Sequence, residues 1–348
     1  MAEEEYLDRF KGTILGNAIG DSLGAPIEFL KHETILERFG KVTNYIDPNK
    51  LSEFTEWVRG EYSDDTEMTL CVLDAIIEHR DISPDKITQN FLKWLDSNPK
   101  DIGLLTKQIL QSIKMGRHWS KASKEIWEAE GGNKPGRNPR ASNGSLMRCA
   151  PIGVYRFCNL NKLIDDSIVV SQITHYDDRC TYSNAVLNYL ISKNIQHDNG
   201  NSPISNRNDI QDAIKLIGKN SPKLKKALQK VYKYVNAFAK GKKQFSQIIT
   251  EFYNKGGYVL DTLSIALICF YCTETFREAI VEAINTGSDN DTAGAVCGSL
   301  AGSFYGYDEI PLEWLRVLKR KDMLVEKSEK LFNVTIGLNQ CVIEVPMK

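Results

Sequence analysis

Two short acidic clusters contain the residue types in this sequence that are best suited to chemistry. The first runs from Ser63 to Glu67, and the second runs from Gly287 to Thr292. Each joins two aspartates to a hydroxyl residue and leads into an apolar segment. Taken singly, either cluster is explained by helix capping, because Ser and Asp are favoured caps and acidic residues in a first turn gain about 0.3–1 kcal/mol from the helix dipole.

The two clusters together favour a cation site. Carboxylates that lie close together in partly buried first turns raise each other's pKa or repel each other unless a positive charge lies between them. Asp, Ser and Thr oxygens without His or Cys suit Mg²⁺, Mn²⁺ or Ca²⁺ rather than zinc. Spacing alone does not establish that the clusters converge.

Two glycine-striped helices are expected to position these clusters. Gly12, Gly16, Gly20 and Gly24 recur every four residues, and so do Gly294, Gly298, Gly302 and Gly306. Each interior glycine costs a helix about 1 kcal/mol relative to Ala, and close helix–helix contact would offset that cost. We therefore expect both helices to pack at the domain centre, with contact between them as one possibility. Asp21 and Glu28 accompany the first stripe.

The remaining pattern predicts an all-α fold in one compact domain over residues 5–325. Apolar residues recur at helical spacing in most segments. Extended candidates are limited to Cys341–Val345 and Lys41–Ile46. Residues 193–209 are polar and rich in Asn, which predicts a mobile surface excursion, and residues 326–348 are expected to form a C-terminal extension packed on the domain. Eight segments have the clearest helical period: 9–23, 68–78, 86–95, 104–115, 163–173, 184–191, 210–217 and 223–239.

Composition excludes several classes of protein. The 348 residues have a formal charge of −1, which gives no global attraction to nucleic acid or to an anionic membrane. The acidic start and the absence of an apolar run near 18 residues favour a cytoplasmic protein without a membrane partner. Cys269 and Cys272 have C-x-x-C spacing but lie in an apolar run, so we interpret them as core thiols rather than zinc or redox residues.

Residues 215–243 carry ten Lys and no acidic residue. The lysines recur at helical spacing, which is typical of one solvated face of a helix pair. The alternative interpretation is a docking site for an acidic partner.

Four motifs in order resemble those of the ADP-ribosylglycohydrolase family, the dinitrogenase reductase-activating glycohydrolase type. The resemblance implies an all-α fold with two Mg²⁺ or Mn²⁺ ions, and hydrolysis of an ADP-ribosyl bond, most of all on arginine of a modified protein. Serine adducts, nucleic acid and small-molecule acceptors stay open, and a monomer is expected. The motifs are Gly12 to Glu28, Ser63 to Thr66, Asn143 to Arg148 and Ser288 to Thr292.

The resemblance also implies roles for individual residues. Glu28 matches a family glutamate near the metals and the scissile ribose, and either Glu28 or Asp65 would be the general base. His175 matches a family histidine near the substrate. Asn143, Gly144 and Ser145 would belong to the loop that holds ADP-ribose. The implied metal ligands are Ser63, Asp64, Asp65, Asp289, Asp291 and Thr292.

Two departures from the family pattern leave every carboxylate in place. Ser63 stands where Thr is common, and Asn290 stands where many members have Thr. Two rival functions remain at this stage: a non-catalytic ADP-ribose-binding or crystallin-like relative, and a metal-dependent phosphohydrolase that uses the same acidic clusters.

Overall fold

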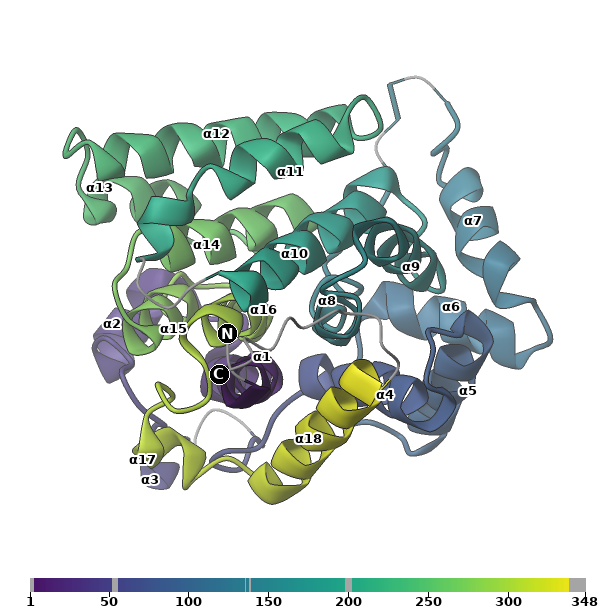
Figure 1. The fold of residues 1–348 in the computed structure, drawn as a ribbon, viewed down its shortest axis with the longest axis horizontal. Coiled ribbons are helices and arrows are strands. Elements are labelled where there is room, and N and C mark those ends of the chain that lie inside the picture. The colour runs from purple at the N-terminus through teal and green to yellow at the C-terminus, as the bar shows by residue number, and fades with distance from the viewer. Residues whose placement is uncertain (1–2, 52–55, 135, 138, 198–201, 338–348) are drawn as a thin grey trace, which may run out of the picture.

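The computed structural model describes residues 3–51, 56–134, 136–137, 139–197 and 202–337. Over these ranges the chain is helical and contains no β-strand, which confirms the all-α prediction (Figure 1). The helices are α1 (Glu3–Gly24), η1 (Ala25–Ile27), α2 (His32–Phe39), α3 (Pro48–Leu51), α4 (Asp64–His79), α5 (Pro84–Asp96), α6 (Leu104–Lys114), α7 (Trp119–Ala129), α8 (Ala150–Tyr155), α9 (Leu160–Gln172), α10 (Asp178–Gln196), η2 (Pro203–Asn206), α11 (Asp209–Ile217), α12 (Pro222–Ala239), α13 (Phe245–Ile249), η3 (Thr250–Phe252), α14 (Val259–Tyr271), α15 (Phe276–Ile284), α16 (Asn290–Tyr305), α17 (Leu312–Leu315) and α18 (Lys321–Gly337).

The two glycine-striped segments form α1 and α16, which lie against each other at the centre of the domain. Their glycines interlock in antiparallel order. A Cβ added to Gly16 would lie 2.2 Å from the carbonyl oxygen of Gly298, and one added to Gly20 would lie 1.9 Å from that of Gly294. No side chain larger than hydrogen fits between these backbones. The expected close packing is therefore confirmed, and each stripe is the partner of the other.

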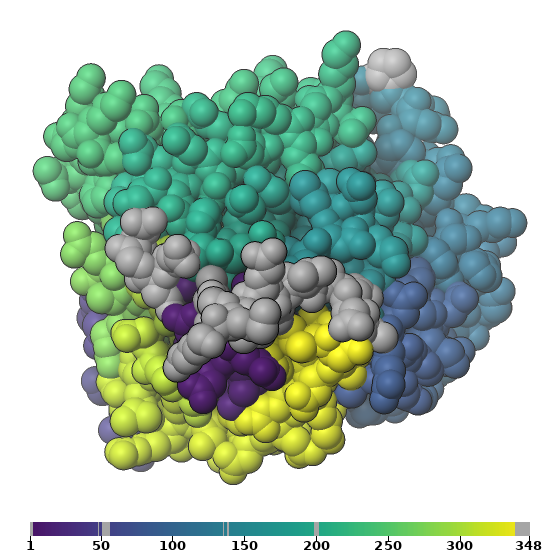
Figure 2. Space-filling model, viewed as in Figure 1, coloured from purple at the N-terminus to yellow at the C-terminus, as the bar shows by residue number. Residues whose placement is uncertain are grey.

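Other helices enclose this central pair. α10 and α14 contact α16, and α11 and α12 form an outer layer over them, at the top of Figure 1. α18 lies beside α1 and α4, so that helices from both ends of the chain adjoin on one face (Figure 2). Among the described residues, no helix is long and apolar enough to cross a bilayer.

All eight segments expected to be helical are helical, but the extended candidate at Lys41–Ile46 is wrong. This segment is irregular, and its Val42 backbone pairs with a side chain instead of a strand. Val42 N donates to Asn285 Oδ1 at 2.9 Å, and Asn285 Nδ2 donates to Val42 O at 2.8 Å. An amide side chain thus supplies both bonds that a neighbouring strand would supply. The other candidate, Cys341–Val345, lies outside the described residues.

Several boundaries differ in detail from the expected ones. The polar stretch 193–209 begins as the end of α10 and includes η2, and residues 198–201 within it lie outside the described part. α18 runs through the expected boundary at 325–326. Cys269 and Cys272 are buried free thiols in and just after α14, as the core interpretation requires.

Candidate metal centre and active site

The first acidic cluster forms the N-terminus of α4, and Asp21 of α1 holds it. Ser63 N donates to Asp21 Oδ1 at 2.9 Å, and Thr66 N donates to Asp21 Oδ2 at 3.0 Å. The Thr66 hydroxyl donates to the same oxygen at 2.5 Å. Asp21 therefore satisfies two backbone donors that the first turn of a helix leaves unpaired. This cap fixes the direction in which Asp64 and Asp65 leave the helix.

The second cluster forms the N-terminus of α16 and meets the first. The Thr292 hydroxyl donates to Asp65 Oδ2 at 3.3 Å, across 227 positions of sequence. Ser63 Oγ donates to the same carboxylate oxygen at 3.3 Å. The two clusters converge, which the sequence alone left open.

Glu28 joins this group from the segment after η1. Phe29 N donates to Ser288 O, and Ser288 N donates to Leu30 O, both at 2.7 Å. Asn290 Nδ2 donates to Ile27 O at 2.9 Å, so the residue that departs from the family pattern helps to hold the Glu28 segment. One oxygen each of Glu28, Asp289 and Asp291 lie within 4.8 Å of one another.

Burial and mutual repulsion make the carboxyl groups of Glu28, Asp64, Asp65 and Asp291 hard to ionise. Burial, and then the charges of Asp101 and Asp289, raise the pKa of Glu28 to about 9. Burial, followed by neighbouring carboxylates, raises the pKa values of Asp64, Asp65 and Asp291 well above their usual range. A positive charge among these carboxyl groups would lower their pKa values again.

The donor atoms fit a hard divalent cation. Asp65 Oδ1 and Asp289 Oδ1 are buried, and neither has a hydrogen-bond partner among the described residues. A buried polar atom without a partner is rare and points to a missing ion or water. The surrounding donors are carboxylate and hydroxyl oxygens, as Mg²⁺, Mn²⁺ or Ca²⁺ prefer.

The carboxylates form one wall of a cavity of about 590 Å³. Asn143 and Gly144 line it, and the Asn143 amide donates to Asp289 Oδ2 at 3.1 Å and to Thr262 Oγ1 at 2.9 Å. Asn143 N donates to Gly257 O at 3.2 Å, which attaches the loop to the start of α14. The volume lies within the range of about 300–1,000 Å³ that is typical of small-molecule sites.

The Ser145 side chain and His175 lie behind Asn143 and Gly144 rather than in the cavity lining. Ser145 Oγ accepts from Ser171 Oγ and from Asn184 Nδ2, both at 3.0 Å. His175 Nε2 lies 2.8 Å from Ser142 Oγ, and burial lowers the pKa of His175 to about 3, so its ring is neutral. A Cβ added to Gly144 would lie 3.1 Å from His175 Cε1. These contacts suit a supporting role for both residues.

Sequence reasoning missed four residues of this site. Asp101 and Tyr258 line the cavity, as does Arg140, and Asp21 caps α4. Asp21 was visible beside the glycine stripe, but nothing in the sequence indicated that its partner was Thr66. Asp101 lies two residues before the N-cap of α6, and no spacing relates it to Glu28 or Asp64.

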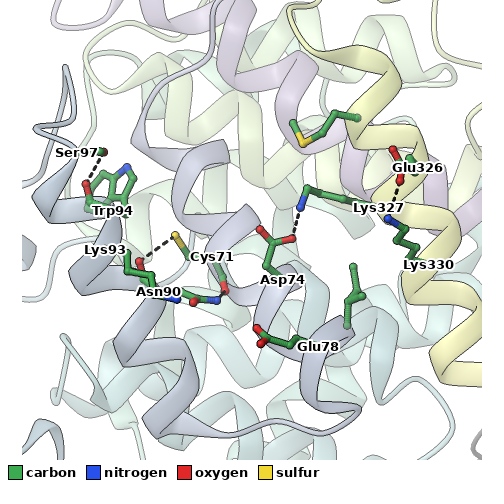
Figure 3. Close-up of a pocket in the computed structure, with 12 residues that line it drawn as sticks. Cys71, Asp74, Glu78, Asn90, Lys93, Trp94, Ser97, Glu326, Lys327 and Lys330 are labelled. Carbon is green, nitrogen blue, oxygen red and sulfur yellow. Dashed lines mark hydrogen bonds and ion pairs between the residues drawn. The ribbon is translucent and has the colours of Figure 1, made fainter.

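A larger cavity of about 740 Å³ lies elsewhere, between α4, α5 and α18 (Figure 3). Its charged groups largely pair with one another. Lys327 pairs with Asp74, and Lys330 lies 2.6 Å from Glu326. None of the expected site residues lines this groove, which sets it apart from the carboxylate cavity.

Comparisons with known proteins agree with the motifs. The model of a family described as ADP-ribosylglycohydrolase matches residues 2–340. The ADP-ribosylarginine hydrolase Tri1 of Serratia proteamaculans is 29% identical, with 95% of this chain and 81% of the relative covered. The ADP-ribosyl-[dinitrogen reductase] glycohydrolase of Rhodospirillum rubrum is 27% identical, with 92% of each covered. A solved structure titled "ADP-ribosylglycohydrolase-related protein complex" matches with a TM-score of 0.70 at 25% identity, over 95% of this chain and 99% of that one.

Proposed function

This chain belongs to the ADP-ribosylglycohydrolase family, and from that premise we propose that it is a metal-dependent hydrolase that releases ADP-ribose from an arginine of a modified protein. A relative named for ADP-ribosylarginine supports arginine as the acceptor. A relative named for dinitrogen reductase supports a modified protein as the substrate. Two Mg²⁺ or Mn²⁺ ions are part of the proposal, as are a monomer and a cytoplasmic location.

The convergence of the two clusters is the observation that carries the proposal. The hydrogen bond from Thr292 to Asp65 joins them, and one buried oxygen each of Asp65 and Asp289 has no hydrogen-bond partner among the described residues. In the proposal the metal ligands are Ser63, Asp64, Asp65, Asp289, Asp291 and Thr292.

The reaction would cleave the bond at the anomeric carbon of the distal ribose, through an oxocarbenium-like transition state. Bound divalent cations would supply positive charge to the ribose hydroxyls and lower the pKa of a water molecule. The general base would be Glu28 or Asp65, each of which must be ionised to accept the proton of that water. With its pKa raised to about 9, Glu28 carries a proton at neutral pH until positive charge is added.

The loop from Asn143 to Ser145 would hold the ADP-ribose. Asn143 and Gly144 line the cavity that is proposed to hold it. Backbone N–H groups in a glycine-bearing loop suit a pyrophosphate. Ser145 and His175 would act from behind, by fixing the position of this loop.

One experiment tests the proposal against its rivals. The purified protein is incubated with Mg²⁺ and ADP-ribosyl-arginine, and the products are separated by chromatography. Free ADP-ribose and arginine are expected. Release of AMP or phosphate would instead indicate a phosphohydrolase, and tight binding of ADP-ribose without turnover would indicate a non-catalytic relative.

A further inference from the structure

A second cavity adjoins the carboxylate centre on another side. It has a volume of about 360 Å³, and Asp64 and Asp101 line both cavities. Ser63, a proposed metal ligand, lines only the second cavity. The carboxylates therefore form a shared wall between two spaces, and a molecule whose scissile bond lies at that wall can extend into both.

The outer wall of the second cavity is a built structure. Lys100 Nζ donates to Glu56 O and to Glu61 Oε2, both at 2.7 Å, and lies 4.2 Å from the centroid of the Trp57 ring. Val58 N also donates to Glu61 Oε2, at 2.8 Å. These contacts fix residues 56–61 as a unit.

The opposite wall is attached to the same unit. Lys319 N donates to Gly60 O at 2.8 Å. Gly60 has a φ of +78°, and a Cβ there would lie 2.0 Å from Val317 O. Residues 56–61 and 317–320 therefore move together, and the space between them keeps its shape.

Charge is divided between the inner and outer parts of this cavity. Asp64 and Asp101 lie at the wall shared with the metal centre, whereas Lys319 and Arg320 are exposed. Two glutamates also line the cavity, and both have partners: Glu61 pairs with Lys100, and Glu67 accepts a hydrogen bond from Trp94 Nε1. No ion pair of Lys319 or Arg320 with a carboxylate is found among the described residues. Val58, which also lines the cavity, is 55% exposed. An exposed apolar side chain beside two cations without a carboxylate partner suits contact with an acidic polypeptide.

We propose that the second cavity receives the acceptor side of the substrate, the polypeptide segment that carries the ADP-ribosylated residue. Lys319 and Arg320 favour acceptors with carboxylates next to that residue. The inference rests on the proposed function, because it assigns the first cavity to ADP-ribose. It names the class of target: a protein modified within an acidic segment.

The test compares two peptides that carry ADP-ribosyl-arginine, one flanked by Asp and Glu and the other by Ser. The enzyme variant is Lys319→Ala with Arg320→Asn. Asn is chosen because Arg320 has a φ of +55°, which Asn tolerates better than Ala. The matched control is Lys121→Ala with Lys162→Ala, which removes two exposed charges from α7 and α9 without touching the cavity.

The cavity variant should raise KM for the acidic peptide about threefold to tenfold, since two exposed charges that attract its carboxylates are removed. Its kcat, its KM for the Ser-flanked peptide and its Kd for free ADP-ribose should stay unchanged, as should all values for the control.

Equal KM for the two peptides in the wild type, or equal effects of the two variants, would overturn the acceptor assignment while leaving the hydrolase in place. Absence of ADP-ribose release from either peptide by the wild type would overturn the proposed function, and the acceptor assignment with it.

Discussion

Helix α1 contacts both acidic clusters, but it does so through a carboxylate on one side and through glycines on the other. Asp21 accepts three hydrogen bonds from Ser63 and Thr66 at the start of α4. At the start of α16 the α1 backbone itself makes the contact, since a Cβ added to Gly24 would lie 2.5 Å from the Cα of Asp291. One cluster is therefore positioned by a polar side chain and the other by the absence of side chains.

The two contacts position the helix ends by different physical means. A carboxylate cap fixes a helix end through directional bonds, and it can be altered by a change of one atom. A glycine contact fixes the distance between two backbones, and it fails only when volume is added. The two clusters should therefore respond differently to the same degree of substitution.

The largest expected effect comes from removing one carboxylate from each cluster. Asp64→Ala and Asp291→Ala should each lower ADP-ribose release by more than the about 10–100-fold seen when a partner of a metal ligand is lost. Metal binding, followed by calorimetry, should weaken in both, and helical circular dichroism should persist. Asp165→Ala, an exposed carboxylate on α9, is the control. Near-normal turnover by both variants would reject the metal assignment.

Glu28→Gln tests whether Glu28 is a general base or a metal ligand, because one of its oxygens lies close to the α16 cluster. As a general base, Glu28 should contribute about 10²–10⁴-fold to the rate, and its loss should leave metal affinity nearly intact. The measurements are single-turnover hydrolysis and metal titration on the same sample. If metal affinity falls as far as in Asp291→Ala, Glu28 is a ligand and Asp65 is left as the candidate base.

Asp21→Asn weakens the cap of α4 without altering an expected metal ligand. The amide keeps one acceptor but turns an N–H group toward Ser63 N or Thr66 N, so that one backbone donor loses its partner. We expect a loss of about 0.5–2 kcal/mol in the free energy of unfolding and about 10–100-fold in turnover.

Thr66→Val provides the matched comparison for the cap. It removes the hydroxyl bond to Asp21 and keeps both backbone bonds, so its effect should be smaller in urea unfolding and in rate. Equal losses in the two variants would show that the backbone bonds to Asp21 contribute little.

Gly298→Ala disrupts the close backbone contact between α1 and α16. The new Cβ would lie 1.9 Å from Gly16 O, and neither backbone has room to give, so we expect a loss of about 1–3 kcal/mol in the free energy of unfolding. Gly337→Ala, at the end of α18 with nothing within 4 Å of the added atom, is the control. If both variants unfold at the same urea concentration as the wild type, the close approach of α1 and α16 is wrong.

The close glycine contact between α1 and α16 was predictable from the sequence. The hydrogen bonds between Asp21 and the start of α4 were not. A stripe of four glycines is costly unless backbones approach, so Gly12 to Gly24 predicted a close contact on general grounds. The same reasoning identified the aspartates at both helix starts. It could not pair Asp21 with Thr66, because a hydrogen bond across 45 positions depends on how two helices cross. Asp101 was missed for the same reason.

The conformation of an irregular segment was also not predictable from the sequence. Lys41–Ile46 looked extended, but the partner of Val42 is the Asn285 side chain, which has no spacing rule. For Ser145 and His175, the resemblance implied a place near the substrate, whereas neither residue lines the cavity.

The loop that carries Asn143 is held in a third way, by a neutral histidine, and the effect predicted from it is the smallest at neutral pH. Burial lowers the pKa of His175 to about 3, whereas an unfolded histidine titrates near 6.5. The unfolded chain therefore binds a proton that the folded chain refuses, and stability falls as pH drops from about 6.5 toward 3. The slope is at most about 1.4 kcal/mol per pH unit.

His175→Gln should flatten this part of the stability curve, as measured by urea unfolding at a series of pH values. The carboxylates contribute equally to both curves, so the difference between them reports His175. Parallel curves for the two proteins would mean that the His175 ring already accepts a proton in the folded state.

The pairing of α1 with α16 has a consequence for synthesis of the chain. α1 is synthesised well before α16, the helix that packs against its glycine face and ends at Tyr305. At about 5–20 residues per second, α1 waits about 15–60 s for its partner. During that time its apolar surface needs temporary cover from a chaperone or from neighbouring helices. A chain that terminates before residue 289 would lack both the partner helix and the two aspartates of the second cluster, and its α1 would stay accessible to quality-control proteases.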